Sequence, residues 1–67
     1  MKIGQLSEAA RTQVETIRFY EREGLLAEPG RTAGNYRIYD QTPLNRLLFI
    51  RPCRALDMTM DEIRVLL

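Results

Sequence analysis

The sequence predicts a mainly α-helical domain of about four helices, with one small β-hairpin between the second helix and the third. Three observations predict this fold class. Apolar residues recur every three or four positions in four segments, capping residues precede three of these segments, and most glycines and prolines lie between residues 24 and 43. A chain of 67 residues has room for one domain, residues 1–67, with a small core.

The first two predicted helices are short and are separated by a tight turn. The first covers Ile3–Ala10, and the second covers about Gln13–Glu23, with Gly24 suited to a left-handed C-terminal cap. The apolar sides are formed by Ile3, Leu6, Ala9 and Ala10 in the first helix, and by Val14, Ile17 and Tyr20 in the second. The turn between them, Arg11–Gln13, has the length found in a helix-turn-helix unit.

Threonines mark the predicted helix starts. Thr12 with Glu15, and Thr59 with Glu62, have the spacing of a capping box, in which each side chain bonds the other residue's backbone amide. Thr42 directly precedes a proline and is expected to cap the third helix. Glu15 has a second interpretation as an acceptor for cytosine N4, but capping is the simpler explanation.

The segment Ala27–Thr42 combines turn residues with a short alternating run and predicts the hairpin. The turn residues are Pro29, Gly30, Gly34 and Asn35, and the alternating run is Tyr36-Arg37-Ile38-Tyr39. Alternation places Tyr36 and Ile38 on one side, with Arg37 and Tyr39 on the other. We expect one of the aromatics to lie in the core.

The third helix is predicted over Pro43–Leu56, and the fourth begins near Met60. Their apolar sides are formed by Leu44, Leu47, Leu48, Phe49 and Ile50, and by Ile63, Leu66 and Leu67. Pro52 conflicts with the third helix, because an interior proline removes an amide donor and crowds the carbonyl four residues earlier. The sequence therefore predicts a kink near Leu48 or an earlier end to the helix.

Charge is distributed unevenly along the chain, although the formal net charge is only +1. Five arginines and one acid, Asp40, lie between residues 31 and 54. Nine of the ten basic residues are arginine, the side chain best suited to bidentate contacts with phosphate and guanine. An ordinary solvated surface explains the same charges, so charge alone leaves both interpretations open.

A helix-turn-helix unit inserts its second helix into the major groove of DNA, so the non-core flank of that helix is the candidate contact surface. The candidates are Thr16, Arg18, Phe19 and Tyr20. Arginine and the hydroxyls suit phosphate or base edges, and the phenyl ring suits sugar or a thymine methyl. At the hairpin tip, Arg31, Asn35, Tyr36 and Arg37 form a projection suited to phosphate or a narrow minor groove. Such a projection is the wing of a winged helix.

Four stretches, "IGQLSEAA", "VETIRFYEREGLL", "GNYRIY" and "LLFIRPCRALDMTMDEIRVLL", resemble the N-terminal DNA-binding domain of MerR-type transcriptional regulators nearly from end to end. The segment "CRALDMT" is further similar to the cadmium- and lead-responsive branch. The resemblance implies a winged helix-turn-helix domain of a homodimer that binds a palindromic promoter. It also implies that the regulator distorts the promoter spacer for RNA polymerase.

The resemblance implies DNA contacts by Thr16, Arg18 and Tyr20, by Arg31, Tyr36 and Arg37 of the wing, and by Arg54 on phosphate. It implies that the full-length protein binds cadmium, lead or a related heavy metal. The family's dimerisation helix and metal-ligand cysteines follow the fourth helix, so these 67 residues are expected to lack both regions. Pro52 departs from the family pattern and makes the reach of Arg51 and Arg54 less certain.

Two other functions stay open beside this one. One is a stand-alone architectural DNA-binding protein similar to phage excisionases. The other is a protein-interaction or metal-carrier module acting through Cys53. Soft metals need at least two thiolates or imidazoles, and the chain has one cysteine and no histidine. We therefore expect Cys53 to serve packing, with no cofactor bound by this chain.

Several function classes are disfavoured by the sequence. The lack of histidine, of a glycine-rich phosphate loop and of a nucleophile with an evident base argues against an enzyme. No apolar run approaches the roughly 20 residues of a membrane helix. The single cysteine favours a reducing, cytoplasmic location.

Overall fold

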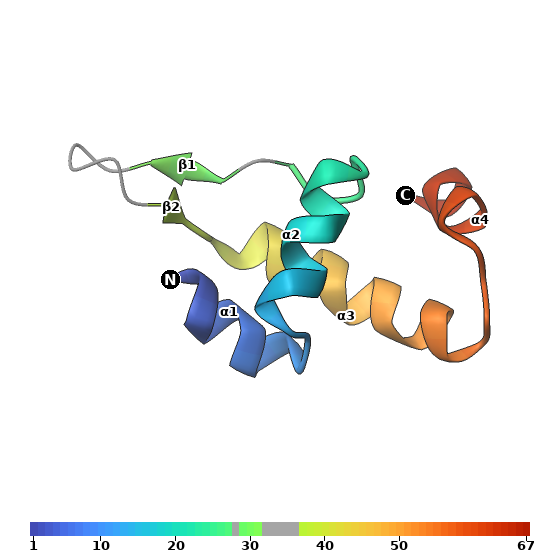
Figure 1. Cartoon of the computed structure of the whole chain (residues 1–67), viewed down its shortest axis with the longest axis horizontal. Helices are drawn as coiled ribbons and strands as arrows, with labels where there is room; N and C mark the ends of the chain where they lie inside the picture. Colours follow the sequence, from blue (N-terminus) through green and yellow to red (C-terminus); the bar gives the residue numbers. More distant parts are fainter. Residues whose placement is uncertain (28, 32–36) are drawn as a thin grey trace.

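The computed structural model describes residues 1–27, 29–31 and 37–67, with the side chains of Arg31 and Arg37 excepted. Four helices and two short strands make up this part of the chain (Figure 1). They are α1 (Ile3–Ala10), α2 (Val14–Arg22), β1 (Gly30–Arg31), β2 (Arg37–Ile38), α3 (Gln41–Ala55) and α4 (Met60–Leu66). The mainly helical class and the four predicted helices are confirmed, and each helix boundary that was predicted lies within two residues of the observed one.

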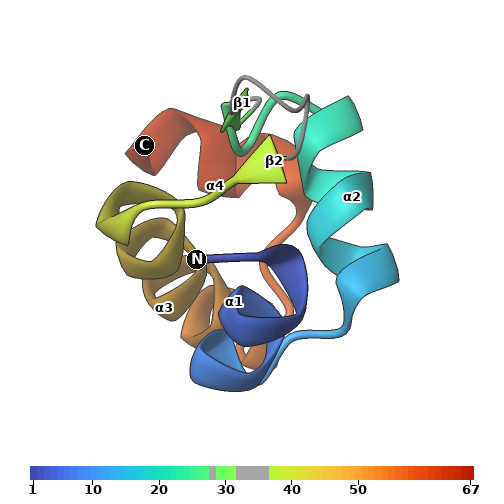
Figure 2. The same cartoon turned by 90° about the vertical axis from the view of Figure 1, so that its left-hand side faces the viewer.

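The longest helix, α3, runs along the length of the molecule, and the other elements are arranged around it (Figure 1). Helix α1 packs against both α2 and α3. After α3 the chain turns back into α4, at the opposite end of the molecule from the two strands (Figures 1 and 2). The buried core is contributed by all four helices and two loops: Leu6, Ala10, Ile17, Tyr20, Leu25, Leu26, Tyr39, Leu47, Ile50, Cys53 and Ile63.

Three helices end in the same way, with a left-handed residue just after the last turn. Gly24 (φ 76°) follows α2, as predicted, and Arg11 (φ 50°) and Asp57 (φ 62°) follow α1 and α3. After α2, the amides of Gly24 and Leu25 donate to the carbonyls of Glu21 and Tyr20, at 3.2 and 2.9 Å. This is a Schellman motif. Arginine and aspartate tolerate the left-handed conformation less well than glycine, at a cost of roughly 1 kcal/mol each.

Of the three predicted threonine caps, one is confirmed and two are wrong. Thr59 and Glu62 form the reciprocal capping box of α4. Helix α2 begins after Gln13 without a side-chain cap bond, because the Thr12 hydroxyl donates to the Ala10 carbonyl instead (3.0 Å). The capping role predicted for Glu15 is therefore also wrong.

The start of α3 also differs from the prediction. Helix α3 is capped by Asp40, whose carboxylate accepts the Thr42 amide at 2.9 Å, so the helix starts two residues earlier than predicted. An aspartate carboxylate can accept the amide of the second helical residue. Because Asp40 forms this bond, Thr42 lies inside the helix and does not cap it.

Pro52 lies inside α3, and the predicted earlier end of that helix is wrong, since the helix continues to Ala55. The proline has no amide to donate to the Leu48 carbonyl. Leu48 and Pro52 are both exposed, so water can satisfy that carbonyl. The amide of Leu56 still donates to the Pro52 carbonyl at 3.1 Å. The kink near Leu48 stays a prediction.

The apolar sides of the helices are narrower than predicted. Ala9, Leu48, Phe49, Leu66 and Leu67 are exposed. Helices α1, α2 and α3 each contribute two or three buried residues to the core, and α4 contributes Ile63, with Met60 partly buried against the core. In the hairpin region Tyr39 is the core aromatic, and Ile38 is 45% exposed. The backbone of Tyr39 exchanges two hydrogen bonds with Met1, which fixes the end of β2 to the start of α1.

The two strands pair antiparallel, with Gly30 opposite Ile38 and Arg31 opposite Arg37. Asn35 of the predicted turn and Tyr36, the first residue of the predicted alternating run, lie outside the described residues. None of the helices has both the length and the apolar character needed to cross a membrane, within the residues that the structure describes.

Candidate nucleic-acid interface

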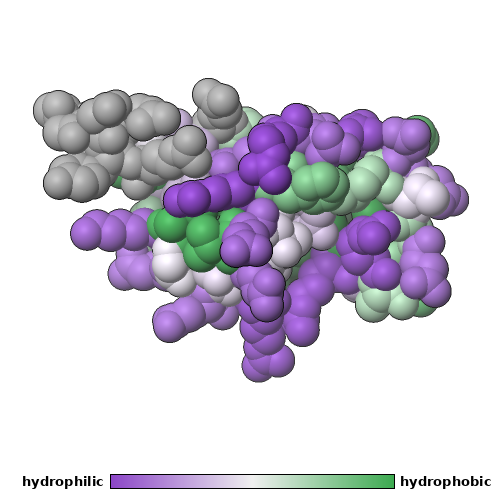
Figure 3. Space-filling view, in the orientation of Figure 1, coloured by the Kyte–Doolittle hydropathy of each residue, from purple (hydrophilic) through white to green (hydrophobic). Residues whose placement is uncertain are grey.

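Helix α2 presents one flank to the core and the other to solvent. Ile17 is fully buried and Tyr20 is 7% exposed, whereas Phe19 is 40% exposed and Arg18 is exposed. Helix α2 lies at the front of Figure 1 and at the right of Figure 2, so its outer flank faces the viewer in Figure 3. Hydrophilic side chains cover most of that face, with smaller apolar patches among them (Figure 3). A polar outer flank beside a buried apolar one suits a helix that docks against a charged partner.

A hollow of about 270 Å³ also borders α2, where the turn between α1 and α2 meets the C-terminal half of α3. Its lining residues are Arg11, Thr12, Gln13, Thr16, Tyr20, Leu47, Arg51 and Arg54. Three of the eight are arginines and none is acidic. A concave surface lined by arginines and hydroxyl-bearing side chains suits an anion such as a phosphate group.

Two hydroxyls hold the turn that forms one wall of this hollow. Ser7 Oγ donates to the Thr12 carbonyl at 2.6 Å, and Thr12 Oγ1 donates to the Ala10 carbonyl at 3.0 Å. These bonds, with the left-handed Arg11, bring the chain from α1 into α2 within three residues. The position of Arg11 and Thr16 at the hollow therefore depends on local bonds within the turn.

The opposite wall is formed by the last turns of α3. Arg51 and Arg54 are three residues apart, so they lie on one side of the helix. Nη1 of Arg54 also donates to the Met58 carbonyl at 2.5 Å. This bond ties the end of α3 to the loop that leads into α4.

Side chains from three other segments hold the exit of α2. Nε and Nη2 of Arg64 donate to the Glu23 carbonyl at 3.2 and 2.7 Å, and Nη1 of Arg46 donates to the Leu25 carbonyl at 3.3 Å. The Tyr39 hydroxyl donates to Glu21 Oε2 at 3.1 Å. Cations at a helix C-terminus also interact favourably with the helix dipole. The C-terminal end of α2 is therefore held to α3, α4 and the end of β2.

These contacts also engage two of the acids of α2 and its exit. Glu23 lies 3.6 Å from Arg64, whose Nη1 also bonds Asp61 at 2.5 Å, and Glu21 accepts the tyrosine bond. The acids at this end of the helix thus have partners within the molecule. Their repulsion toward a polyanion on the outer flank is correspondingly reduced.

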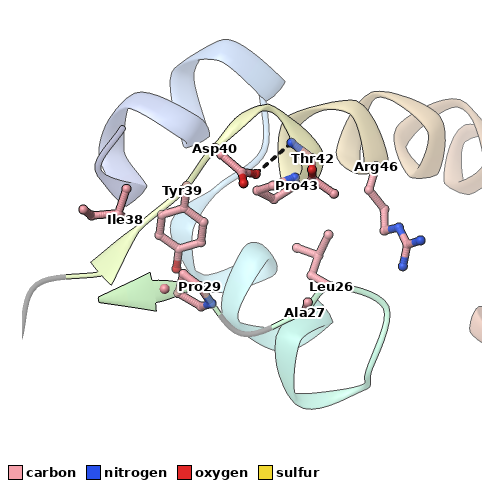
Figure 4. Close-up of a pocket in the computed structure, with 10 residues that line it drawn as sticks. Leu26, Ala27, Pro29, Ile38, Tyr39, Asp40, Thr42, Pro43 and Arg46 are labelled. Atoms are coloured by element: carbon pink, nitrogen blue, oxygen red, sulfur yellow. Dashed lines mark hydrogen bonds between the residues drawn. The ribbon is translucent and has the colours of Figure 1, made fainter. Parts of the chain in front are cut away.

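A second hollow, of about 290 Å³, lies between the strands and the start of α3 (Figure 4). It is mostly apolar, with the Asp40 carboxylate and the Arg46 guanidinium at its rim. It contains none of the side chains that the sequence suggested as contact residues. We assign it no role in the interface.

The structure brings some of the predicted contact residues together and leaves others undescribed. Thr16, Tyr20 and Arg54 line the arginine-bearing hollow, and Arg18 and Phe19 lie on the outer flank of α2. The backbones of Arg31 and Arg37 face each other across the strand pair. Asn35 and Tyr36 lie outside the described residues.

Sequence reasoning missed Arg11, Thr12 and Gln13 as lining residues, and it did not include Arg51 among the contacts. For Arg51 a signal was present in the sequence, because its spacing of three residues from Arg54 places both on one side of the helix. No local pattern signalled Arg11, because its place follows from a left-handed turn and from the approach of a distant helix.

Cys53 is buried in the core cluster beside Ile50. Such a position serves packing, as expected. In the described ranges no three residues of the types His, Cys, Asp and Glu gather in a way that could hold a metal ion.

Comparisons with known proteins place this geometry in a family. The model of the MerR HTH family of regulatory proteins matches residues 1–67. The HTH-type transcriptional regulator ZntR homolog of Haemophilus influenzae is 52% identical over 67 residues, which are 100% of this chain and 50% of that protein. The chain thus spans about half the length of the relatives it matches.

Two solved structures share the fold. The transcription regulator PbrR691 of Ralstonia metallidurans CH34, solved with lead(II), is 62% identical, with a TM-score of 0.89 over 98% of this chain and 52% of that one. HiNmlR, a MerR family regulator lacking the sensor domain and bound to promoter DNA, is 24% identical, with a TM-score of 0.87 over 98% and 50%. Because the family model matches residues 1–67, the chain belongs to the MerR family of helix-turn-helix regulatory proteins.

Proposed function

We propose that residues 1–67 are the winged helix-turn-helix DNA-binding domain of a metal-responsive transcriptional regulator. In this proposal the outer flank of α2 enters the major groove, and the adjacent hollow accepts the sugar-phosphate backbone. One observation carries the proposal: α2 exposes Arg18 and Phe19 to solvent, and its residues Thr16 and Tyr20 line a hollow whose lining includes three arginines and no acid.

Each candidate residue has a role that its position permits. Arg18 and Phe19, both exposed, contact base edges or a thymine methyl. Thr16, Tyr20 and Arg54 line the hollow and contact phosphates. Tyr20 is only 7% exposed, so its contact with DNA is limited to the small part of the residue that borders the hollow.

The strand pair is the base of the proposed wing. The antiparallel register of β1 and β2 supports a hairpin that projects from the domain. The contacts proposed for it are those of Arg31, Asn35, Tyr36 and Arg37 with phosphate or a narrow minor groove.

The larger protein is proposed to be a homodimer on a palindromic promoter, acting with RNA polymerase in the cytoplasm by distorting the promoter spacer. A heavy metal such as cadmium or lead is the proposed effector. The support is a relative, 62% identical, solved with lead(II), whose length is about twice that of this chain. The metal would bind outside these 67 residues, and no enzymatic activity is proposed, since the relatives are transcriptional regulators.

A stand-alone architectural protein of the excisionase type is the alternative. The regulator family matched over residues 1–67 favours the first function.

Selection from a random duplex library tests sequence-specific binding and does not require the promoter sequence. The 67-residue chain should enrich a defined half-site motif over several rounds. Arg18→Ala should relax the motif at one position, because a bidentate arginine contact contributes about 1–3 kcal/mol of base discrimination. Lys2→Gln is the control, since it removes a positive charge at the start of α1 and outside the hollow. If the chain enriches no motif above the unselected library, sequence-specific binding is refuted.

A further inference from the structure

Arg11 stands out in the hollow because its backbone is in a conformation that suits a different residue. Its φ of 50° is in the left-handed region, where L side chains are disfavoured and glycine is common. The amides of Arg11 and Thr12 donate to the carbonyls of Glu8 and Ser7, at 3.3 and 3.1 Å, so the conformation is fixed by the end of α1. Glycine would satisfy this turn at lower cost. Packing does not explain the arginine either, because it is exposed.

The position of the side chain supplies a reason for the arginine. Arg11 lines the hollow on the side of the helix-turn-helix turn, opposite Arg51 and Arg54 of α3. The three cations come from two segments that are distant in sequence, and Thr12 and Thr16 also line the hollow. Residues in unfavourable backbone conformations are concentrated at functional sites, where the cost is retained for the sake of function.

We propose that Arg11 is a DNA-phosphate contact, and that its left-handed conformation is a stability cost kept for binding. The inference rests on the proposed function and extends it to a residue that no sequence motif marks. A phosphate seated in the hollow is contacted by Arg11 from the turn and by Arg51 and Arg54 from α3. Such a contact fixes the angle between the domain and the DNA backbone and reads no base.

Asp57 provides a matched control within the same chain. Among the residues that the structure describes, it is the other left-handed residue that is not glycine, it also follows a helix, and it lies outside the lining of the hollow. Replacing either residue by glycine removes a backbone cost of the same kind. Only the replacement of Arg11 removes a cation from the hollow.

The experiment measures thermal unfolding and duplex binding of the 67-residue chain and three variants. The probe is a short fluorescent duplex of mixed sequence, titrated over a range of salt concentrations, since phosphate contacts do not depend on sequence. Arg11→Gly should raise the midpoint of thermal unfolding by about 4 °C. It should also weaken binding about tenfold and lower the slope of log K against log salt by about 0.9.

The other variants separate backbone strain from charge. Asp57→Gly should raise the midpoint similarly and leave binding unchanged or tighter, because it removes a negative charge. Lys2→Gln, at the opposite end of α1, should leave both the midpoint and the salt slope unchanged.

Each contrary result has a distinct meaning. Unchanged affinity and slope in Arg11→Gly, with salt-dependent binding by the parent chain, would overturn the role of Arg11 and leave the proposed function standing. A lower midpoint for Arg11→Gly would overturn the stability cost. Failure of the parent chain to bind the duplex at low salt would overturn the proposed function and this inference together.

Discussion

At the scale of single residues, the start of α3 shows which of two neighbouring polar side chains acts as the cap. Asp40 accepts the Thr42 amide, whereas the Thr42 side chain is exposed. Asp40→Ala should therefore lower the free energy of unfolding by about 1 kcal/mol. Thr42→Ala should change the free energy of unfolding by no more than about 0.3 kcal/mol, because no cap bond is lost. Urea denaturation measures both variants. Equal losses in the two variants would contradict the cap seen in the structure.

The capping box of α4 makes stability depend on pH. The backbone amide of Thr59, and next its side chain, lower the pKa of Glu62 below its ordinary value of 4.5. A lowered pKa in the folded state means that the carboxylate stabilises the fold above pH 4.5. This stabilisation is lost as the pH falls below 4.5 and through the lowered pKa.

Glu62→Gln isolates this contribution, because glutamine keeps an acceptor oxygen but does not titrate. The parent chain should be the more stable at neutral pH, and the two unfolding free energies should converge below pH 4.5. Urea denaturation at a series of pH values measures both curves. If the difference between the two unfolding free energies stays constant across that pH range, the charge of Glu62 does not contribute to stability.

At the scale of elements, the Arg64 side chain links α4 to the exit of α2 by hydrogen bonds. Arg64 contributes two bonds to the Glu23 carbonyl and a separate ion pair with Asp61. Arg64→Ala should lower the free energy of unfolding by about 0.5–1 kcal/mol, a small loss because the side chain is partly exposed. It should also speed amide exchange at Leu25 and Leu26, whose amides donate to the Tyr20 carbonyl.

Asp61→Ala is the matched control for this contact. It breaks only the ion pair, whose carboxylate is 92% exposed, and should change stability little. Exchange at Leu25 should then match that of the parent chain. If both variants open the exit of α2 equally, the contact of Arg64 with the Glu23 carbonyl depends on the ion pair with Asp61, which lies within α4.

Elements were predictable from sequence where the signal is local. The helical spacing of Leu6, Ile17 and Leu47 placed the helices, and Gly24 placed the end of α2. Prediction failed where a polar side chain has several nearby partners. Thr12 has the spacing of a cap, but its hydroxyl bonds the Ala10 carbonyl, and the choice depends on the left-handed turn at Arg11.

At the scale of the whole molecule, the candidate interface was only half predictable. The outer flank of α2 follows from helical periodicity, because Arg18 and Phe19 fall outside the stripe of Ile17 and Tyr20. The hollow could not be predicted from periodicity, because it forms only where the turn after α1 lies against the last turns of α3. Contacts between distant segments are set by packing of the core, and one sequence carries no local record of them.

The proposed homodimer predicts how affinity should scale with the number of domains. One copy engages one half-site, so its binding relies on a single flank and a single hollow. Two copies joined by a flexible glycine-serine linker make the second contact intramolecular. The linked pair should therefore bind an inverted repeat of the selected half-site about 10²- to 10⁴-fold more tightly than one copy does.

The control for this prediction is a duplex with one half-site, for which the linked pair should gain only about twofold from having two equivalent domains. Fluorescence anisotropy at fixed salt measures all four affinities. A linked pair that gains equally on one half-site and on the inverted repeat would mean that the second domain binds without regard to sequence. The palindromic mode of binding would then be wrong, although a single domain could still read its half-site through α2.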